Sequence, residues 1–120
     1  MQDKINNISL IGPMGSGKTT VGRRLAEVLK IDFYDADYEI INRTGVSIDH
    51  IFDIEGEEGF RKRESSVLKD LCLKPNIVLA TGGGAVLLGK NRDMIKKMGS
   101  VIYLSSSVDQ ILRRTSKSKT

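Results

Sequence analysis

The stretch NISLIGPMGSGKTT, residues 7–20, decides the fold of this chain. It begins with a short apolar run that closes on Gly12 and predicts a buried strand. The residues GPMGSGKT, from Gly12 to Thr19, then match the pattern G-x-x-x-x-G-K-[ST], which lies between a strand and a helix in the proteins that use it. A strand, a glycine-rich loop and a helix in this order predict a site for phosphate groups.

The residue types of this phosphate-binding loop, Gly12–Thr19, suit a nucleotide. Gly15 and Gly17 allow the loop to fold so that its N–H groups converge on an anion, and the following helix N-terminus adds partial positive charge. In this pattern the lysine, Lys18, is expected to reach the β- and γ-phosphates, and the Thr19 hydroxyl can ligate Mg²⁺. The alternative is a glycine-rich turn without a ligand. The position between strand and helix favours the nucleotide site.

Short apolar runs alternate with amphipathic segments along the rest of the chain. Strands are predicted at residues 7–12, 33–35, 76–81 and 100–105. Helices are predicted at residues 18–29, 38–42, 47–52, 57–73 and 90–98, and another begins over 108–114. This alternation predicts an α/β fold with a parallel sheet covered on both faces. Ligands of such sheets collect at the carboxyl ends of the strands, so the functional residues are expected in the segments that follow them.

Composition narrows the class of protein. The 120 residues are enough for one domain, and 39% hydrophobic with 28% charged residues is ordinary for a globular protein. The net charge of +4 suggests anionic partners, and the single cysteine, Cys72, excludes an internal disulfide. The chain has no apolar run near the roughly 18 residues of a membrane helix and no secretory signal at its start. We therefore expect a cytoplasmic protein without a membrane segment.

Two carboxylates follow the second predicted strand. In YDAD, Asp35 and Asp37 are two residues apart, and strand alternation turns both side chains to one side if the strand persists that far. Next to a triphosphate, one carboxylate would face the metal shell and the other would hold or deprotonate an acceptor hydroxyl. The alternative is that the pair caps the next helix.

Three glycines follow the third predicted strand. In LATGGGAV, residues 79–86, the apolar run ends at Thr81 and continues as Gly82, Gly83 and Gly84. Residues without Cβ allow a second substrate to touch main-chain N–H groups directly. The alternative is a tight strand-to-helix turn with no ligand.

A basic residue lies beside the apolar face of the long predicted helix. In GEEGFRKRES, Phe60 belongs to the apolar face, so Arg61 is rotated by about 100° from it and can point into the cleft. A guanidinium there suits a planar carboxylate. The alternative is a solvated helix face, on which Glu57, Glu58 and Glu64 pair with Arg61 and its neighbours.

The segments IGPMGSGKTTVGRRLAEVL, FYDADYEI, GEEGFRKRES, LATGGGAV and RRT, in this order and spacing, resemble shikimate kinase over essentially the whole chain. The resemblance implies transfer of the γ-phosphoryl group of ATP to the 3-hydroxyl of shikimate, a step toward the aromatic amino acids. It also implies a three-layer P-loop kinase fold with the sheet order 2-3-1-4-5.

The resemblance also implies roles for individual residues. The nucleotide would be bound by Gly15, Ser16, Gly17, Lys18, Thr19, Thr20 and, against adenine, Arg114. Lys18 and Asp37 would be catalytic, with Asp37 on the acceptor hydroxyl. Thr19 would ligate Mg²⁺ and Asp35 would lie near the metal through water. Shikimate would meet Asp37, Arg61, Gly82, Gly83 and Gly84.

In the family, the segment after RRT holds a mobile lid, a fifth strand, another substrate arginine and a last helix, whereas this sequence stops at Thr120. We therefore expect a single kinase domain over residues 1–120 that is incomplete at its C-terminus and lacks the fifth strand. The missing arginines would stabilise transferring charge, and a lid excludes water, so the chain as written should turn over little.

Parts of the sequence pattern also fit other functions. A gluconate kinase keeps a carboxylate on its substrate, so Arg61 alone does not exclude it, whereas a nucleotide acceptor would need further arginines. A nucleotide-binding module without catalysis has little reason to retain both Asp35 and Asp37. The basic tail RRTSKSKT suggests nucleic acid, but no binding motif supports it. We expect a monomer whose partners are shikimate and ATP, with no nucleic acid and no membrane.

Overall fold

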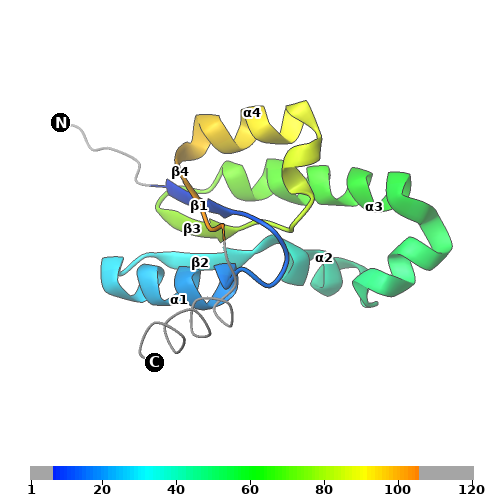
Figure 1. The fold of residues 1–120 in the computed structure, drawn as a ribbon, viewed down its shortest axis with the longest axis horizontal. Helices are drawn as coiled ribbons and strands as arrows, with labels where there is room; N and C mark the ends of the chain where they lie inside the picture. The colour runs from blue at the N-terminus through cyan, green and yellow to red at the C-terminus, as the bar shows by residue number, and fades with distance from the viewer. Residues whose placement is uncertain (1–6, 106–120) are drawn as a thin grey trace, which may run out of the picture.

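A four-stranded parallel sheet forms the centre of the computed structural model, which describes residues 7–105 (Figure 1). Its strands are β1 (Asn7–Ile11), β2 (Asp32–Asp35), β3 (Ile77–Ala80) and β4 (Gly99–Tyr103). The helices are α1 (Lys18–Leu29), α2 (Ala36–Thr44), α3 (Ile48–Cys72), the short 3₁₀ helix η1 (Ala85–Leu87) and α4 (Gly89–Met98). The predicted α/β class is confirmed. The helix predicted from Val108 to Arg114 lies outside the described residues.

The strand order is β2-β3-β1-β4, and every neighbouring pair is parallel. Ile8 of β1 pairs with Val78 of β3 and with Ser100 of β4, so β1 lies inside the sheet. This order agrees with the expected 2-3-1-4 portion of the family sheet. Because the strands are parallel, the carboxyl ends of β1, β2 and β3 meet at one edge, where the loops that follow them gather.

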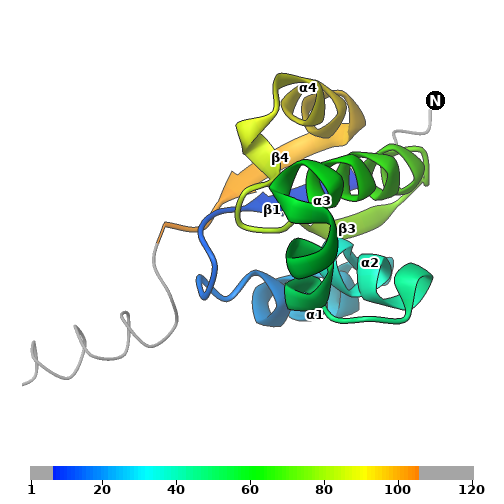
Figure 2. The same ribbon diagram turned by 90° about the vertical axis from the view of Figure 1, so that its right-hand side faces the viewer.

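The sheet buries one apolar cluster on each face, because successive side chains of β3 point to opposite sides. Ile77 and Leu79 pack with α2, α3 and the end of α4. Val78 packs with Leu10 and with Ala26 of α1. Figure 2 shows the result: α1 lies on one side of the sheet, and α3 and α4 lie on the other.

Helix α1 has the predicted bounds, but of its larger apolar residues only Leu25 packs against the core. Val21, Val28 and Leu29 recur at helical spacing, yet they are exposed, Val28 at 64%. The buried face is formed by Lys18, Gly22 and Ala26. A Cβ on Gly22 would lie 2.5 Å from Cε1 of Phe33, so glycine lets the helix approach the sheet closely.

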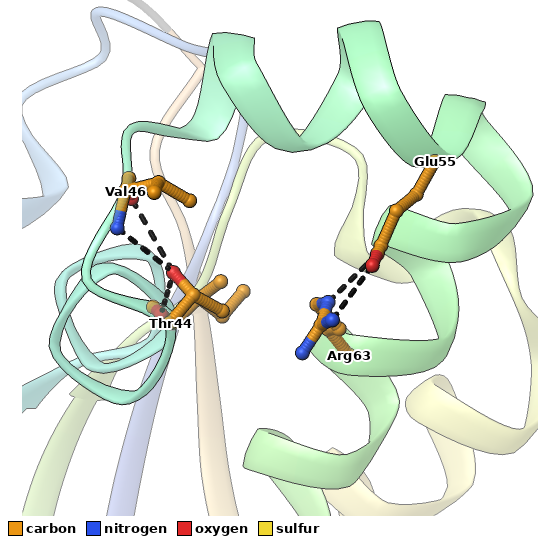
Figure 3. A network of polar contacts seen from close by, with 5 residues as sticks. Thr44, Val46, Glu55 and Arg63 are labelled. Carbon is orange, nitrogen blue, oxygen red and sulfur yellow. Dashed lines mark hydrogen bonds and ion pairs between the residues drawn. The ribbon is translucent and has the colours of Figure 1, made fainter.

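Helix α3 bends at Gly56, which joins the two helices predicted on either side of it. Ser47 caps the first part, as predicted, by accepting a hydrogen bond from the His50 N–H. Beyond the bend, Arg63 donates two hydrogen bonds of 2.7 Å to the Glu55 carboxylate and so ties the two parts together (Figure 3). The bend places the apolar face of the second part on the sheet. Over residues 7–105, no helix has both the length and the apolar character needed to cross a membrane.

Candidate active site

The phosphate-binding loop connects β1 to α1 and turns with glycines in the left-handed region. Gly15 and Gly17 have φ angles of 78° and 95°. The Nζ atom of Lys18 donates to the carbonyl oxygens of Gly12 and Pro13, at 2.7 and 2.9 Å. Burial lowers the pKa of Lys18, while the nearby carboxylates of Asp37 and Asp35 act to raise it. The loop thus places a mostly buried cation next to two acids.

A cleft of about 280 Å³ opens beside this loop. Its lining combines the loop with the carboxyl ends of β2 and β3: Met14, Gly15, Ser16, Gly17, Lys18, Thr19, Thr20, Asp35, Asp37, Thr81, Gly82 and Gly83. The sequence predicted that the segments after these strands would meet at one place, and the structure brings them together. Arg114 lies outside the described residues.

Asp35 connects the second strand to the loop. Its Oδ2 accepts a 2.7 Å hydrogen bond from Thr19 Oγ1, and its Oδ1 accepts one from the Tyr38 N–H at 3.1 Å. Asp35 is therefore the N-cap of α2 as well as a lining residue of the cleft. The sequence left helix capping and a place in the site as alternatives for this residue, and Asp35 does both.

Asp37 reaches the cleft by a route that differs from the expected one. Strand β2 ends at Asp35, so Asp37 lies in the first turn of α2 and the turn of the helix, not strand alternation, aims its side chain. Its Oδ1 is buried and has no hydrogen-bond partner among the described residues. Burial, and then the charge of Asp35, raise the pKa of Asp37, against Lys18 and Arg61, which lower it.

The three glycines are required because site residues lie against each of them. A Cβ on Gly82 would be 2.7 Å from Asp37 Oδ1, and one on Gly83 would be 3.1 Å from the main-chain nitrogen of Met14. A Cβ on Gly84 would collide with the guanidinium of Arg61. None of the three has a positive φ angle, so close approach and not backbone strain explains the glycines.

Arg61 lies behind the glycine turn, residues 82–84, and does not line the cleft. Its side chain is 17% exposed, and Nη1 donates to Glu64 Oε1 at 2.8 Å. Its Nε lies 3.5 Å from Glu57 Oε2. It lines a neighbouring hollow of about 410 Å³ between α3 and the start of α4, with Glu57, Glu58, Lys62, Leu87, Leu88 and Lys90. Arg61 is thus largely buried, which contradicts the solvated-face alternative.

Sequence reasoning gave Glu64 no part in the site beyond pairing on a charged face. The structure buries it completely, at 0% exposure, with Oε2 lying 3.1 Å from the position of a Cβ on Gly82. The one available signal was its spacing of three residues from Arg61 in GFRKRE. That spacing places the two side chains together but does not tell which face of the helix is buried.

A parallel sheet of this order, with a phosphate-binding loop after its first strand and two carboxylates at the same edge, defines the class of P-loop kinases. The family model described as shikimate kinase matches residues 14–120. The chain belongs to the shikimate kinase family.

Individual relatives agree with this assignment. A protein of Nitrosospira multiformis named shikimate kinase is 60% identical over 94% of this chain, and one of Legionella pneumophila is 55% identical over 95%. The chain spans 58% and 65% of the lengths of these two proteins.

Solved structures show the same likeness. The shikimate kinase of Acinetobacter baumannii in complex with shikimate has 51% identity and a TM-score of 0.86, covering 97% of this chain and 65% of that one. The Aquifex aeolicus shikimate kinase has 43% identity and a TM-score of 0.80, covering 88% of this chain and 63% of that one.

Proposed function

We propose that this chain carries the nucleotide site and much of the acceptor site of a shikimate kinase, which transfers the γ-phosphoryl group of ATP to the 3-hydroxyl of shikimate. The observation that carries the proposal is the cleft in which Asp37 faces the same space as Lys18. An acid beside a phosphate site suits a hydroxyl acceptor, because it accepts the proton or the hydrogen bond of the attacking group.

In the proposed step the 3-hydroxyl oxygen attacks the γ-phosphorus, the bond from phosphorus to the β-phosphate oxygen breaks, and ADP leaves. Asp37 holds the hydroxyl and receives its proton. Lys18 exchanges the loop carbonyls for the β- and γ-phosphates, which are stronger acceptors because they are charged. The loop N–H groups and the α1 N-terminus hold the phosphates in line with the acceptor.

We assign the carboxylate of shikimate to Arg61, and the contact of the ring with main chain to Gly82, Gly83 and Gly84. The guanidinium is planar, and its Nε, although 3.5 Å from Glu57, makes no hydrogen bond among the described residues. It packs against Gly84, one residue beyond the cleft lining, which supports its role at the far end of a small substrate.

The proposed metal is Mg²⁺, with Thr19 as a ligand and Asp35 near it through water. Thr19 Oγ1 and Asp35 Oδ2 lie 2.7 Å apart at the cleft, and both are oxygen donors, which Mg²⁺ prefers. Residues 7–105 contain no cluster of three acidic, histidine or cysteine ligands, but Mg²⁺ in kinases needs only one or two protein oxygens besides phosphate and water. The ion would neutralise charge on the phosphates. We also propose a monomer and a cytoplasmic location.

The test is a coupled assay of ADP formation with shikimate, gluconate or AMP as acceptor. We expect ADP with shikimate only, and we expect Asp37→Asn to lose about 10²- to 10⁴-fold of the rate while nucleotide still raises its Tm. Asp32→Asn, at the exposed first residue of β2, the strand that leads into α2, is the matched control and should retain the rate.

Preference for gluconate or AMP would replace the proposal with another small-molecule kinase. Nucleotide binding without ADP formation from any acceptor would support the non-catalytic module instead. An unchanged rate in Asp37→Asn would remove Asp37 from the mechanism.

A further inference from the structure

A pair of buried polar side chains connects α3 to α4 beside the glycine turn, residues 82–84. Asn91 of α4 has no exposed surface, and Ser65 of α3 is buried as well. The Ser65 hydroxyl donates a 2.8 Å hydrogen bond to Asn91 Oδ1, and Asn91 Nδ2 donates one of 2.9 Å to the carbonyl oxygen of Ala85. Neither side chain lines the cleft, and the proposed mechanism uses neither.

The direction of both hydrogen bonds is fixed by chemistry. A carbonyl oxygen only accepts, so the amide of Asn91 must turn its NH₂ group toward Ala85 and its oxygen toward Ser65. The Ser65 hydroxyl has one hydrogen and gives it to Asn91, although a serine inside a helix commonly donates to the carbonyl four residues earlier. Ser65 therefore ties α3 to a neighbouring helix instead of to itself.

Ala85 is the residue through which this pair acts on the glycine turn. It is fully buried, directly follows Gly84, and donates its N–H to the Gly82 carbonyl oxygen at 3.1 Å. Its own carbonyl oxygen is the one that Asn91 holds. Asn91 thus fixes the residue that closes the turn.

The other end of the network lies close to Arg61 in the sequence of α3. Ser65 follows Arg61 by four residues, so the two side chains lie one above the other on the same face of the helix. The guanidinium of Arg61 packs against Gly84, with no room for a Cβ between them. Both groups assigned to shikimate on this side, the guanidinium and the main chain of the turn, are therefore held by one network.

Filling the space between α3 and α4 does not require polar side chains. An apolar side chain of similar volume would bury more nonpolar surface, whereas a buried amide is costly unless both of its ends are paired. A fully paired buried network does, however, specify one arrangement of the elements that it joins. The pair of Asn91 and Ser65 is therefore best explained by the geometry that it imposes.

We propose that Asn91 is a positioning residue for the acceptor: together with Ser65 it sets the separation between the Arg61 guanidinium and the main chain of the glycine turn. This inference rests on the proposed function, in which these two groups hold shikimate, and it adds to that function two residues that do not touch the substrate. Loss of the network should weaken the binding of shikimate and leave the binding of ATP, which the phosphate-binding loop holds, unchanged.

The experiment measures ADP formation, and from it kcat and KM for shikimate and for ATP, in the wild type, Ser65→Ala and Asn91→Leu. We expect kcat/KM for shikimate to fall about 10-fold in Ser65→Ala, which keeps the bond from Asn91 to Ala85, and about 100-fold in Asn91→Leu. The loss should lie in KM for shikimate, because Lys18 and Asp37 come from other elements, and KM for ATP should not change.

Two further variants separate the hydrogen bond from the space that the side chain fills. Ser65→Thr keeps the hydroxyl and should restore the KM of the wild type. Ser66→Ala removes a hydroxyl from an exposed neighbour on the same helix and should behave as the wild type.

A merely structural role predicts a different result: kcat and Tm fall together, while both KM values stay as in the wild type. That result overturns the proposal, and so does an equal rise of the two KM values. If Asn91→Leu does not fold, Ser65→Ala decides alone. Calorimetric titration with shikimate gives the same comparison as Kd if turnover is slow.

Failure of the proposed function would look different. A wild type that binds shikimate without forming ADP, with weaker binding in Ser65→Ala, would support the positioning role and reject the proposed reaction. Wild-type kinetics in both Ser65→Ala and Asn91→Leu would reject the positioning role and leave the proposed reaction in place.

Discussion

At Gly82 the missing Cβ leaves room for two carboxylate oxygens, one from Asp37, which lines the cleft, and one from the buried Glu64. The backbone there would tolerate a side chain, because Gly82 does not have a positive φ angle. A methyl group, however, would lie 2.7 Å from Asp37 Oδ1 and 3.1 Å from Glu64 Oε2, so both acids would have to move.

We predict that Gly82→Ala lowers kcat/KM for shikimate by roughly 100-fold, the effect of a displacement of about 1 Å at a reacting group. Nucleotide affinity should remain, since the loop that binds phosphate is not displaced. Steady-state kinetics with a nucleotide titration measure both quantities. Gly89→Ala is the control, because a Cβ at this first residue of α4 meets only Arg92 Nη2, at 3.4 Å. Wild-type kinetics in Gly82→Ala would contradict the proposed packing of the acids.

Asp37 is expected to reduce stability in return for activity. Its pKa is raised, chiefly by burial and then by Asp35, while Lys18 and Arg61 oppose the shift. The folded chain therefore binds this proton more tightly than the unfolded chain. The resulting stability is fully present below the unfolded pKa, near 4, and is lost as the pH rises through the folded value.

We therefore predict that Asp37→Asn unfolds a few degrees above the wild type at pH 7, and that the difference in Tm shrinks toward pH 4. Thermal unfolding followed by circular dichroism over this pH range provides the measurement. The pKa of Glu64 is raised first by burial and also by the charge of Asp37, and the variant removes this second cause, which adds to the expected gain in Tm at pH 7. A difference in Tm that does not depend on pH would show that burial of the charge is not the cause.

Among the elements, helix α3 depends on its bend. Gly56 has φ 73° and ψ −179°, a combination that is essentially restricted to glycine. No atom outside its chain neighbours lies within 4 Å of a Cβ there, so a substitution acts on the backbone and not through a clash. The bend changes the direction of the chain between the first part of the helix, where Ile51 is buried, and the second part, whose Phe60 and Leu68 lie in the same core.

We predict that Gly56→Ala lowers the free energy of unfolding by about 1–3 kcal/mol. Urea denaturation is the measurement. Gly45→Asn is the matched control, because Gly45, with φ 77° and ψ 8°, is in the left-handed region that asparagine also enters, and we expect a loss below about 1 kcal/mol. Equal losses in the two variants would mean that the conformation at Gly56 is not special.

At the scale of the whole molecule, the four-stranded sheet ends in β4, whose five residues are all exposed. The chain spans 58% of the length of the Nitrosospira multiformis relative. The phosphate-binding loop, both carboxylates of the cleft and the glycines after β3 all lie within the described residues.

We predict that residues 1–120 bind ATP, because the phosphate-binding loop and the first turn of α1 are already positioned by the sheet. The increase of Tm with ATP reports binding in this chain and in that relative. A Tm that ATP leaves unchanged in this chain but raises in the relative would contradict the prediction.

The sequence alone predicted what depends on neighbours along the chain. Helix α1 begins at Lys18 because the glycine-rich loop precedes it, and α3 begins after Ser47 because the hydroxyl caps it. The parallel α/β class follows from alternating strands and helices, and the lining of the cleft follows from the common edge of those strands. The resemblance to shikimate kinase, which the family match confirms, rested on local motifs of the same kind.

The tertiary structure decided which side chains meet across elements. The bent helix α3 packs against the sheet and α2, and this packing buries Glu64 and places Arg61 behind Gly84. The same packing explains why each residue of the turn after β3, residues 82–84, must be a glycine. The buried face of α1, at Gly22 and Ala26, likewise depends on the ring of Phe33. Contacts between residues as distant as Asp37, Glu64 and Gly82 arise only after the chain is packed, because periodicity describes one element and carries no information about its partner.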